Sequence, residues 1–118
     1  LATAARATFD QMLEDWPARP EVEEEVLAAP APGLEDDLGE VLVVWLQELL
    51  FRFETRRLVP LRYDFKTTGP DTIRADVGFG RFEPGRHRTR LEVKAVTYHQ
   101  IEVREAPDGW HARFILDI

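Results

Sequence analysis

The C-terminal end of the chain concentrates the residues that could do chemistry. The sequence ends one residue after Asp117, so we expect its side-chain carboxylate and the main-chain carboxylate of Ile118 to lie close together. Two anions that close repel each other unless a cation lies between them, and hard divalent cations are held by clusters of oxygen ligands. The pair therefore indicates a divalent-cation site. A solvated, frayed terminus is the alternative, although the apolar neighbours of the pair favour an end packed into a sheet.

Further polar residues are candidates for a functional site. Glu92, Lys94 and His99 lie where polar and apolar side chains alternate as in a β-strand, and a later strand carries Asp117. If these strands are neighbours, Glu92, Lys94 and Asp117 converge into a small polar site for a cation or a phosphate. His99 is a possible general base, but a lone histidine at a strand end more often only makes a hydrogen bond. Glu48 interrupts a mostly apolar helix, where an acid more often lies at the rim than in a functional site.

Several classes of active site are excluded by residue types. The chain contains neither serine nor cysteine, so neither can serve as a catalytic nucleophile, and disulfides and thiolate metal sites are impossible. The lack of cysteine fits a cytoplasmic protein. His87, His99 and His111 do not have the spacing of zinc ligands. There is no P-loop and no glycine-rich phosphate fingerprint.

Charge is distributed unevenly along the chain. Residues 1–54 carry 3 basic and 13 acidic side chains, whereas residues 55–118 carry 12 basic and 9 acidic ones. The acidic half repels phosphate backbones, so direct, non-specific binding of nucleic acid is disfavoured. A basic protein, or a protein that already holds RNA, is a better match as partner. The alternative is that the acidity serves solubility alone.

The first half of the chain predicts a helix, a strand and a second helix. The first helix ends at Pro17 and has an apolar stripe of Ala5, Phe9, Met12, Leu13 and Trp16. A strand follows at residues 20–27. The second helix covers about residues 38–53, capped by Asp37 with Glu40 three positions later. Its apolar residues spread round most of the cylinder, which indicates a central helix covered on more than one side.

From residue 58 onward the hydrophobic period changes to two, which is typical of strands. Residues 61–66 and 73–79 predict an antiparallel hairpin, and residues 91–99 and 110–116 predict further strands separated by a turn at 107–109. The order of elements predicts an α+β two-layer sandwich, with an antiparallel or mixed sheet and two helices packed on one face. The 118 residues form a single domain with no apolar run that spans a membrane, and no signal peptide is visible.

Four blocks of this sequence resemble the archease family. They are residues 45–53, 82–88, 92–99 and 108–118, and the run Lys-Ala-Val-Thr-Tyr-His at 94–99 followed by a C-terminal Asp-Ile is highly specific. Archeases activate the GTP-dependent RNA-splicing ligase, which joins RNA ends in tRNA splicing and RNA repair. The resemblance implies an α+β fold and a protein that is not itself an enzyme. Such a protein would promote guanylylation and multiple turnover of the ligase and meet RNA only indirectly.

The resemblance also implies a metal and a working surface. In the family a metal ion, usually calcium, is held by an N-terminal aspartate, the penultimate aspartate and the terminal carboxylate. The last two correspond to Asp117 and Ile118. The N-terminal aspartate belongs to a His-Thr-Ala-Asp-like strand that this sequence lacks, so we expect a truncated N-terminus that places that strand upstream of Leu1. The candidate residues that face the partner are Glu48, Glu92, Lys94 and His99.

Two rival functions come from other classes of protein. A free-standing metal-dependent phosphoesterase is disfavoured because Ser and Cys are missing and the carboxylates are too few for a two-metal site. A general chaperone-like binding module would need an exposed apolar surface of several hundred Å². The alternating strands give no sign of such a surface.

Overall fold

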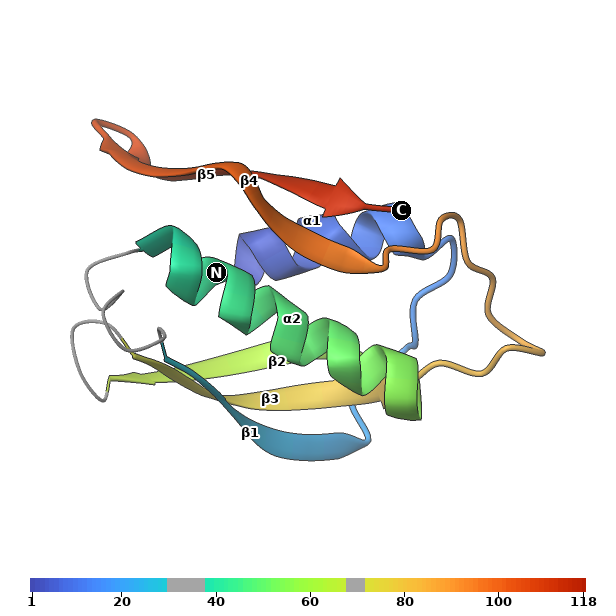
Figure 1. Ribbon diagram of the computed structural model, residues 1–118. Coiled ribbons are helices and arrows are strands. Elements are labelled where there is room, and N and C mark those ends of the chain that lie inside the picture. The colour runs from blue at the N-terminus through green and yellow to red at the C-terminus, as the bar shows by residue number, and fades with distance from the viewer. Residues whose placement is uncertain (30–37, 68–71) are drawn as a thin grey trace.

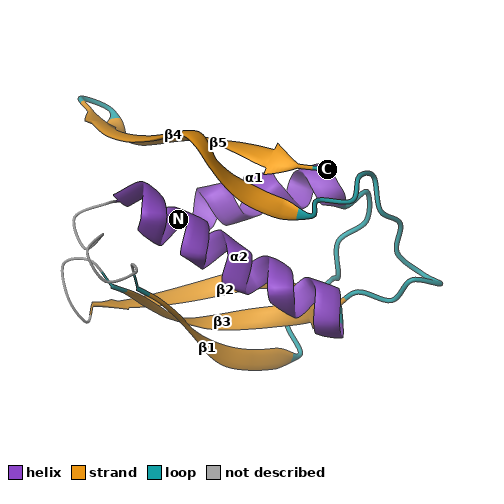
Figure 2. Cartoon of the chain, in the orientation of Figure 1, coloured by secondary structure: helices purple, strands orange, loops and turns teal. Residues whose placement is uncertain are grey.

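The computed structural model describes residues 1–29, 38–67 and 72–118, without the side chains of residues 38, 67, 98–100 and 110. Two helices and five strands follow each other along the chain (Figures 1 and 2). They are α1 (Ala2–Met12), β1 (Val22–Ala28), α2 (Leu38–Arg56), β2 (Leu58–Thr67), β3 (Ile73–Arg81), β4 (Ala95–Ala106) and β5 (Gly109–Asp117).

The first sheet has the strand order β1-β3-β2, and both pairings are antiparallel. Side chains alternate between its faces, and Val26, Val77 and Phe79 are buried on the face that packs against the helices. In the predicted hairpin, Phe65 pairs with Ala75, so the hairpin of residues 61–66 and 73–79 is confirmed.

Helix α2 forms the middle of the molecule (Figures 1 and 2). The three-stranded sheet lies on one side of it, and the β4–β5 hairpin lies on the other. Trp45, Leu46 and Leu49 are completely or almost completely buried. The apolar residues therefore surround most of this helix because it is covered from two sides, as its sequence predicts.

The α+β class is confirmed, as is the packing of both helices on one face of an antiparallel sheet. The strands divide into two sheets. The second is the β4–β5 hairpin, which adds a further layer over α2 (Figure 2). Within the described part of the chain, no helix is both long and apolar enough to cross a membrane.

Two predicted boundaries are wrong. Helix α1 ends at Met12 rather than at Pro17, because Leu13 is extended and forms a bridge with Thr89. Residues 91–94 are not strand, since β4 begins only at Ala95. At the end of α1 the backbone bonds to a segment far away in the sequence, since the amide of Arg90 donates to the carbonyl oxygen of Met12. Residues 91–94, by contrast, join no ladder in the described part of the chain. The Asp37 cap lies outside the described residues.

Strand β3 approaches a neighbouring segment closely through its glycines. A Cβ atom at Gly80 would lie 2.5 Å from Cβ of Pro17, and one at Gly78 would lie 3.1 Å from Cβ of Pro20. The segment that leads into β1 therefore packs directly against the backbone of β3. The absence of a side chain at these two glycines therefore permits the close approach.

Candidate functional site at the chain end

The start of β4 and the end of the chain lie side by side. The amide of Lys94 donates a hydrogen bond of 2.7 Å to the carbonyl oxygen of Asp117, and Ala95 pairs with Asp117 in the ladder. The structure thus brings Lys94 and Asp117 together through their backbones, while the predicted convergence of their side chains with that of Glu92 stays a prediction. Both side chains are exposed, and no ion pair joins them among the described residues. Ala95, not Lys94, lies directly opposite Asp117 in the ladder, so the backbones of Lys94 and Asp117 meet here while each side chain is exposed to solvent.

Glu92 lies just before this place, on the loop of residues 82–94. Its exposed side chain lines a cleft formed with the C-terminal end of α2. Glu92 is therefore close to Lys94 in the sequence, and its side chain belongs to the lining of this cleft. Its predicted role toward a partner stays a prediction.

His99 lies within β4, in the stretch where the register with β5 shifts between Thr97 and Glu102. Its side chain is outside the described part of the structure, so its proposed role stays a prediction. The shift opposes a longer stretch of β4 to a shorter stretch of β5, which is the pattern of a β-bulge. Such irregularities re-aim side chains at sheet edges.

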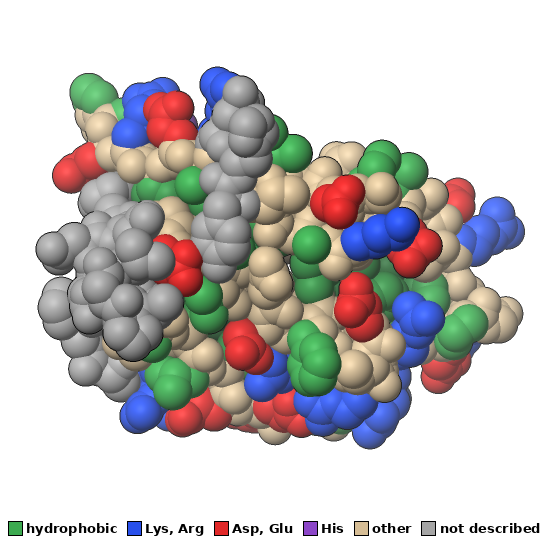
Figure 3. Space-filling model, viewed as in Figure 1, with side chains coloured by type: hydrophobic (Ala, Val, Ile, Leu, Met, Phe, Trp, Pro, Cys, Tyr) green, Lys and Arg blue, Asp and Glu red, His purple; other side chains and the backbone are tan. Residues whose placement is uncertain are grey.

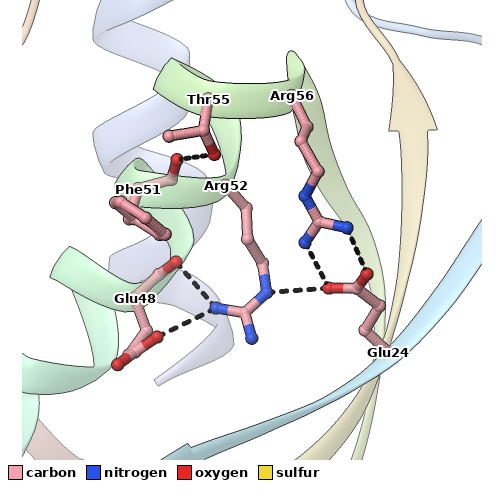
Figure 4. Close-up of polar contacts among 6 residues, drawn as sticks. All are labelled: Glu24, Glu48, Phe51, Arg52, Thr55 and Arg56. Atoms are coloured by element: carbon pink, nitrogen blue, oxygen red, sulfur yellow. Dashed lines mark hydrogen bonds and ion pairs between the residues drawn. The ribbon is translucent and has the colours of Figure 1, made fainter.

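Glu48 lies apart from the chain end, in a network of ion pairs between α2 and β1 (Figure 4). This network, here called the arginine bracket, consists of Glu24, Glu48, Arg52 and Arg56. Arg52 donates from Nη1 to Glu48 over 3.0 Å and from Nε to Glu24 over 3.0 Å. Arg56 donates two hydrogen bonds, of 2.5 and 2.6 Å, to the same Glu24 carboxylate. The bracket gives Glu48 a partner within the fold, while its predicted contact with another protein stays a prediction.

The bracket makes the stability of the fold depend on pH. Hydrogen bonds from Arg56 and then from Arg52 lower the pKa of Glu24 from 4.5 to about 2, against the opposing effect of burial. Because the folded pKa lies below the unfolded one, the contribution is complete above about pH 4.5 and is lost as the pH falls toward about 2.

We expect Glu24→Gln to lower the free energy of unfolding by about 1–2 kcal/mol near pH 7, since half-exposed Arg56 is screened by solvent. The difference from wild type should shrink steadily below about pH 4.5, as measured by urea unfolding at several pH values. Glu23→Gln, on the outward face of the same strand, is the control and should be near neutral. A Glu24→Gln difference that does not change with pH would contradict the assignment.

The structure permits a test of whether the chain end fits a metal. The carboxylates of Asp117 and Ile118 are hard oxygen donors, the type that calcium prefers, and both residues are exposed. On the same face of the hairpin, the hydroxyl oxygen of Thr97 is buried without a hydrogen-bond partner in the structure. However, the described residues contain no group of three His, Cys, Asp or Glu side chains that could hold a metal. The donor type therefore fits a cation, but these residues supply only part of a coordination shell.

Sequence reasoning missed two arginines. Arg52 passes for an ordinary helix residue, yet it bridges Glu48 and Glu24. Its position four residues after Glu48 is the signal that could have revealed one of these contacts. Arg57, directly after α2, has a positive φ of 56°, which no local pattern predicts.

The fold and the site define a small α+β protein with an exposed polar site where the start of β4 meets the chain end. The Archease protein family matches residues 1–118, the whole chain. The protein archease of Methanosarcina mazei is 33% identical over 98% of this chain and 78% of that protein. The protein archease of Methanopyrus kandleri is 32% identical over 100% of this chain and 83% of that protein. The chain therefore belongs to the archease family, which confirms the resemblance seen in the sequence.

Proposed function

We propose that this protein is a non-catalytic activator of a GTP-dependent RNA-splicing ligase. It promotes guanylylation and multiple turnover of that ligase in tRNA splicing and RNA repair, in the cytoplasm. The observation that carries the proposal is the archease match over residues 1–118. The protein acts on its ligase partner and meets RNA only through it.

The exposed chain-end site supports this role. Lys94 is exposed and joins no ion pair among the described residues, so its positive charge is available to a partner. The chain has neither Ser nor Cys to act as a nucleophile of its own. Such an arrangement suits contact with another protein better than catalysis.

The two rival functions receive little support. A phosphoesterase needs a metal cluster with several carboxylates, and the described residues contain none. A general chaperone needs a continuous apolar surface. On the face seen in Figure 3, the exposed hydrophobic side chains are interspersed with charged ones.

The test mixes a cognate ligase, GTP, a divalent metal and an RNA with a cyclic-phosphate end, with and without this protein. We expect the full-length protein to accelerate ligase guanylylation and to allow multiple turnover. Lys94→Ala should reduce this acceleration by about 10-fold or more and leave the melting temperature nearly unchanged, because only a contact to the partner is removed. The readouts are guanylylated ligase and joined RNA against time.

The matched control is Lys66→Ala, which removes the chain's other lysine. Lys66 pairs with Asp76 on the three-stranded sheet, away from the chain end, and should leave the acceleration intact. No acceleration by the full-length wild type with a cognate ligase would overturn the proposed function. Turnover of a phosphate ester by the protein alone would favour the phosphoesterase instead.

We also propose that Asp117 and the carboxylate of Ile118 help to hold one divalent cation, with calcium as the first ion to test. Both are oxygen donors, but they are too few to complete a calcium shell by themselves. Further oxygen ligands, from other residues or from water, are therefore needed to complete the shell.

In a calorimetric titration of the full-length protein with calcium, we expect Asp117→Ala to weaken binding by at least about 10-fold, because one anionic ligand is lost. Asp108→Ala is the control, since Asp108 is an exposed acid at the other end of the same hairpin, where it bonds to His111. Equal affinity in wild type and Asp117→Ala would refute the site.

A further inference from the structure

A cleft of about 490 Å³ opens where the C-terminal end of α2 meets the loop of residues 82–94. Its floor is apolar and buried, and consists of Met12, Phe53, Phe82 and Val93. The aromatic rings of this floor pack edge to face, with the centroids of Phe53 and Phe82 5.5 Å apart. Each of these four residues exposes only 2–6% of its surface, so the floor itself offers a partner little more than the edges of its side chains.

Arg57 stands at the rim of this cleft in an unusual conformation. It is the only non-glycine residue in the described part of the chain with a positive φ, a region that most residues avoid. Its amide donates to the carbonyl oxygen of Phe53, and its own carbonyl oxygen accepts from the amide of Phe82. The guanidinium carbon lies 5.1 Å from the centroid of the Phe53 ring. The backbone therefore holds a positive charge directly over the apolar floor.

The loop that forms the opposite wall is irregular but firmly held. The amides of residues 86 and 87 donate to the carbonyl oxygen of Glu83, and the carbonyl oxygen of Arg88 accepts from two amides just after α1. The amide of Arg88 donates to the carboxylate of Asp15. Leu91, with 44% of its surface exposed, is presented beside the cleft by this anchored loop.

The same loop carries a local excess of positive charge. Residues 81–94 contain five basic and two acidic side chains, a net charge of +3. Because the whole chain has a net charge of −7, the remaining residues together carry −10. Among the described residues, Arg88, Arg90 and Lys94 join no ion pair. Lys and Arg side chains project from this end of the molecule (Figure 3). An acidic partner is attracted to this end and repelled by the remainder.

We propose that this cleft binds an acidic segment of the ligase partner. An apolar side chain of that segment rests against Leu91 and the exposed edge of Phe82, and a neighbouring carboxylate pairs with Arg57. This inference rests on the proposed function and names a docking surface for it. A protein segment is favoured over RNA because the cleft suits an apolar side chain and a single carboxylate is enough to pair with Arg57. Glu54 and Glu92, which also line the cleft, oppose the repeated charges of a phosphate backbone.

The test measures binding of the full-length protein to its cognate ligase by titration calorimetry at low and moderate salt. Arg57→Glu should weaken binding by about 10-fold or more and reduce its dependence on salt. Leu91→Glu is a second variant, on an exposed loop residue beside the cleft. It tests the same surface if Arg57→Glu perturbs the fold. Arg62→Glu, an equal charge reversal on the three-stranded sheet, is the control and should bind like wild type.

The outcomes separate the inference from the function that it extends. If the wild type accelerates the ligase, and Arg57→Glu and Leu91→Glu bind it as tightly as wild type, the cleft is not the docking surface. Binding of a single-stranded RNA oligonucleotide is measured by fluorescence anisotropy. If Arg57→Glu and Leu91→Glu lose affinity for this RNA but bind the ligase as tightly as wild type, the inference is overturned in favour of RNA. A wild type that neither binds nor accelerates a cognate ligase overturns the proposed function and this inference together.

Discussion

Leu49→Ala is expected to lower the free energy of unfolding by about 2–5 kcal/mol. Leu49 is completely buried on α2 and belongs to the main hydrophobic core. Truncation removes apolar contacts and leaves a cavity that close-packed neighbours fill only in part. Equilibrium unfolding in urea, followed by far-UV circular dichroism, measures the effect.

The control lies two residues further along the same helix. Phe51 has 61% of its surface exposed, so Phe51→Ala should change stability by less than about 0.5 kcal/mol apart from helix propensity. A Leu49→Ala midpoint that equals wild type would show that the buried face of α2 is misassigned.

Gly80→Ala is expected to lower the free energy of unfolding by about 1–3 kcal/mol, although it adds only a methyl group. The new Cβ would lie 2.5 Å from Cβ of Pro17 and 2.8 Å from Cδ1 of Leu61. The ring atom of a proline cannot rotate away, so the segment before β1 must move off β3. Thermal or urea unfolding measures the loss.

The glycines of the chain supply their own controls for this experiment. A Cβ at Gly85 would meet no atom within 4 Å, so Gly85→Ala should be neutral or slightly stabilising. Gly78→Ala should fall between the two, because its closest contact is 3.1 Å. If Gly80→Ala and Gly85→Ala have the same stability, the close approach of Pro17 is not rigid.

The sequence predicts those elements whose structure is decided by their own side-chain pattern. The apolar stripe of α2 and the alternation of β2 and β3 require burial on particular faces, and the structure places these faces in the core. The glycines of β3 show a different dependence, because the prolines that pack against them become neighbours only in the folded chain.

The errors occur where the backbone bonds to distant segments. No residue near Met12 predicts the end of α1 there. The amide of Arg90 donates a hydrogen bond to the carbonyl oxygen of Met12, and the backbone is extended from Leu13. Residues 91–94 alternate like a strand but pair with no strand over that length. Periodicity reports which side chains are apolar, whereas a strand also needs a neighbour to complete its hydrogen bonds.

The candidate site was predicted in part for similar reasons. The backbone contact between Lys94 and Asp117 follows from antiparallel strands joined by a short turn, whereas the convergence of the side chains of Glu92, Lys94 and Asp117 stays a prediction. The arginine bracket depends on β1 lying beside α2, which the sequence does not specify. The position of Arg57 over Phe53 depends on the positive φ of Arg57, and the periodicity of the sequence does not predict such an angle.

The division of the strands into two sheets has a mechanical consequence. The ladder of β4 joins it to β5, and among the described residues neither strand pairs with the three-stranded sheet. The hairpin rests on α2 mainly through side chains such as Val96, together with a hydrogen bond from Gln47 to the carbonyl oxygen of Val96. The position of the hairpin over α2 is therefore set, in the described part of the chain, by side-chain packing and by this side-chain hydrogen bond, and not by a ladder shared with the three-stranded sheet.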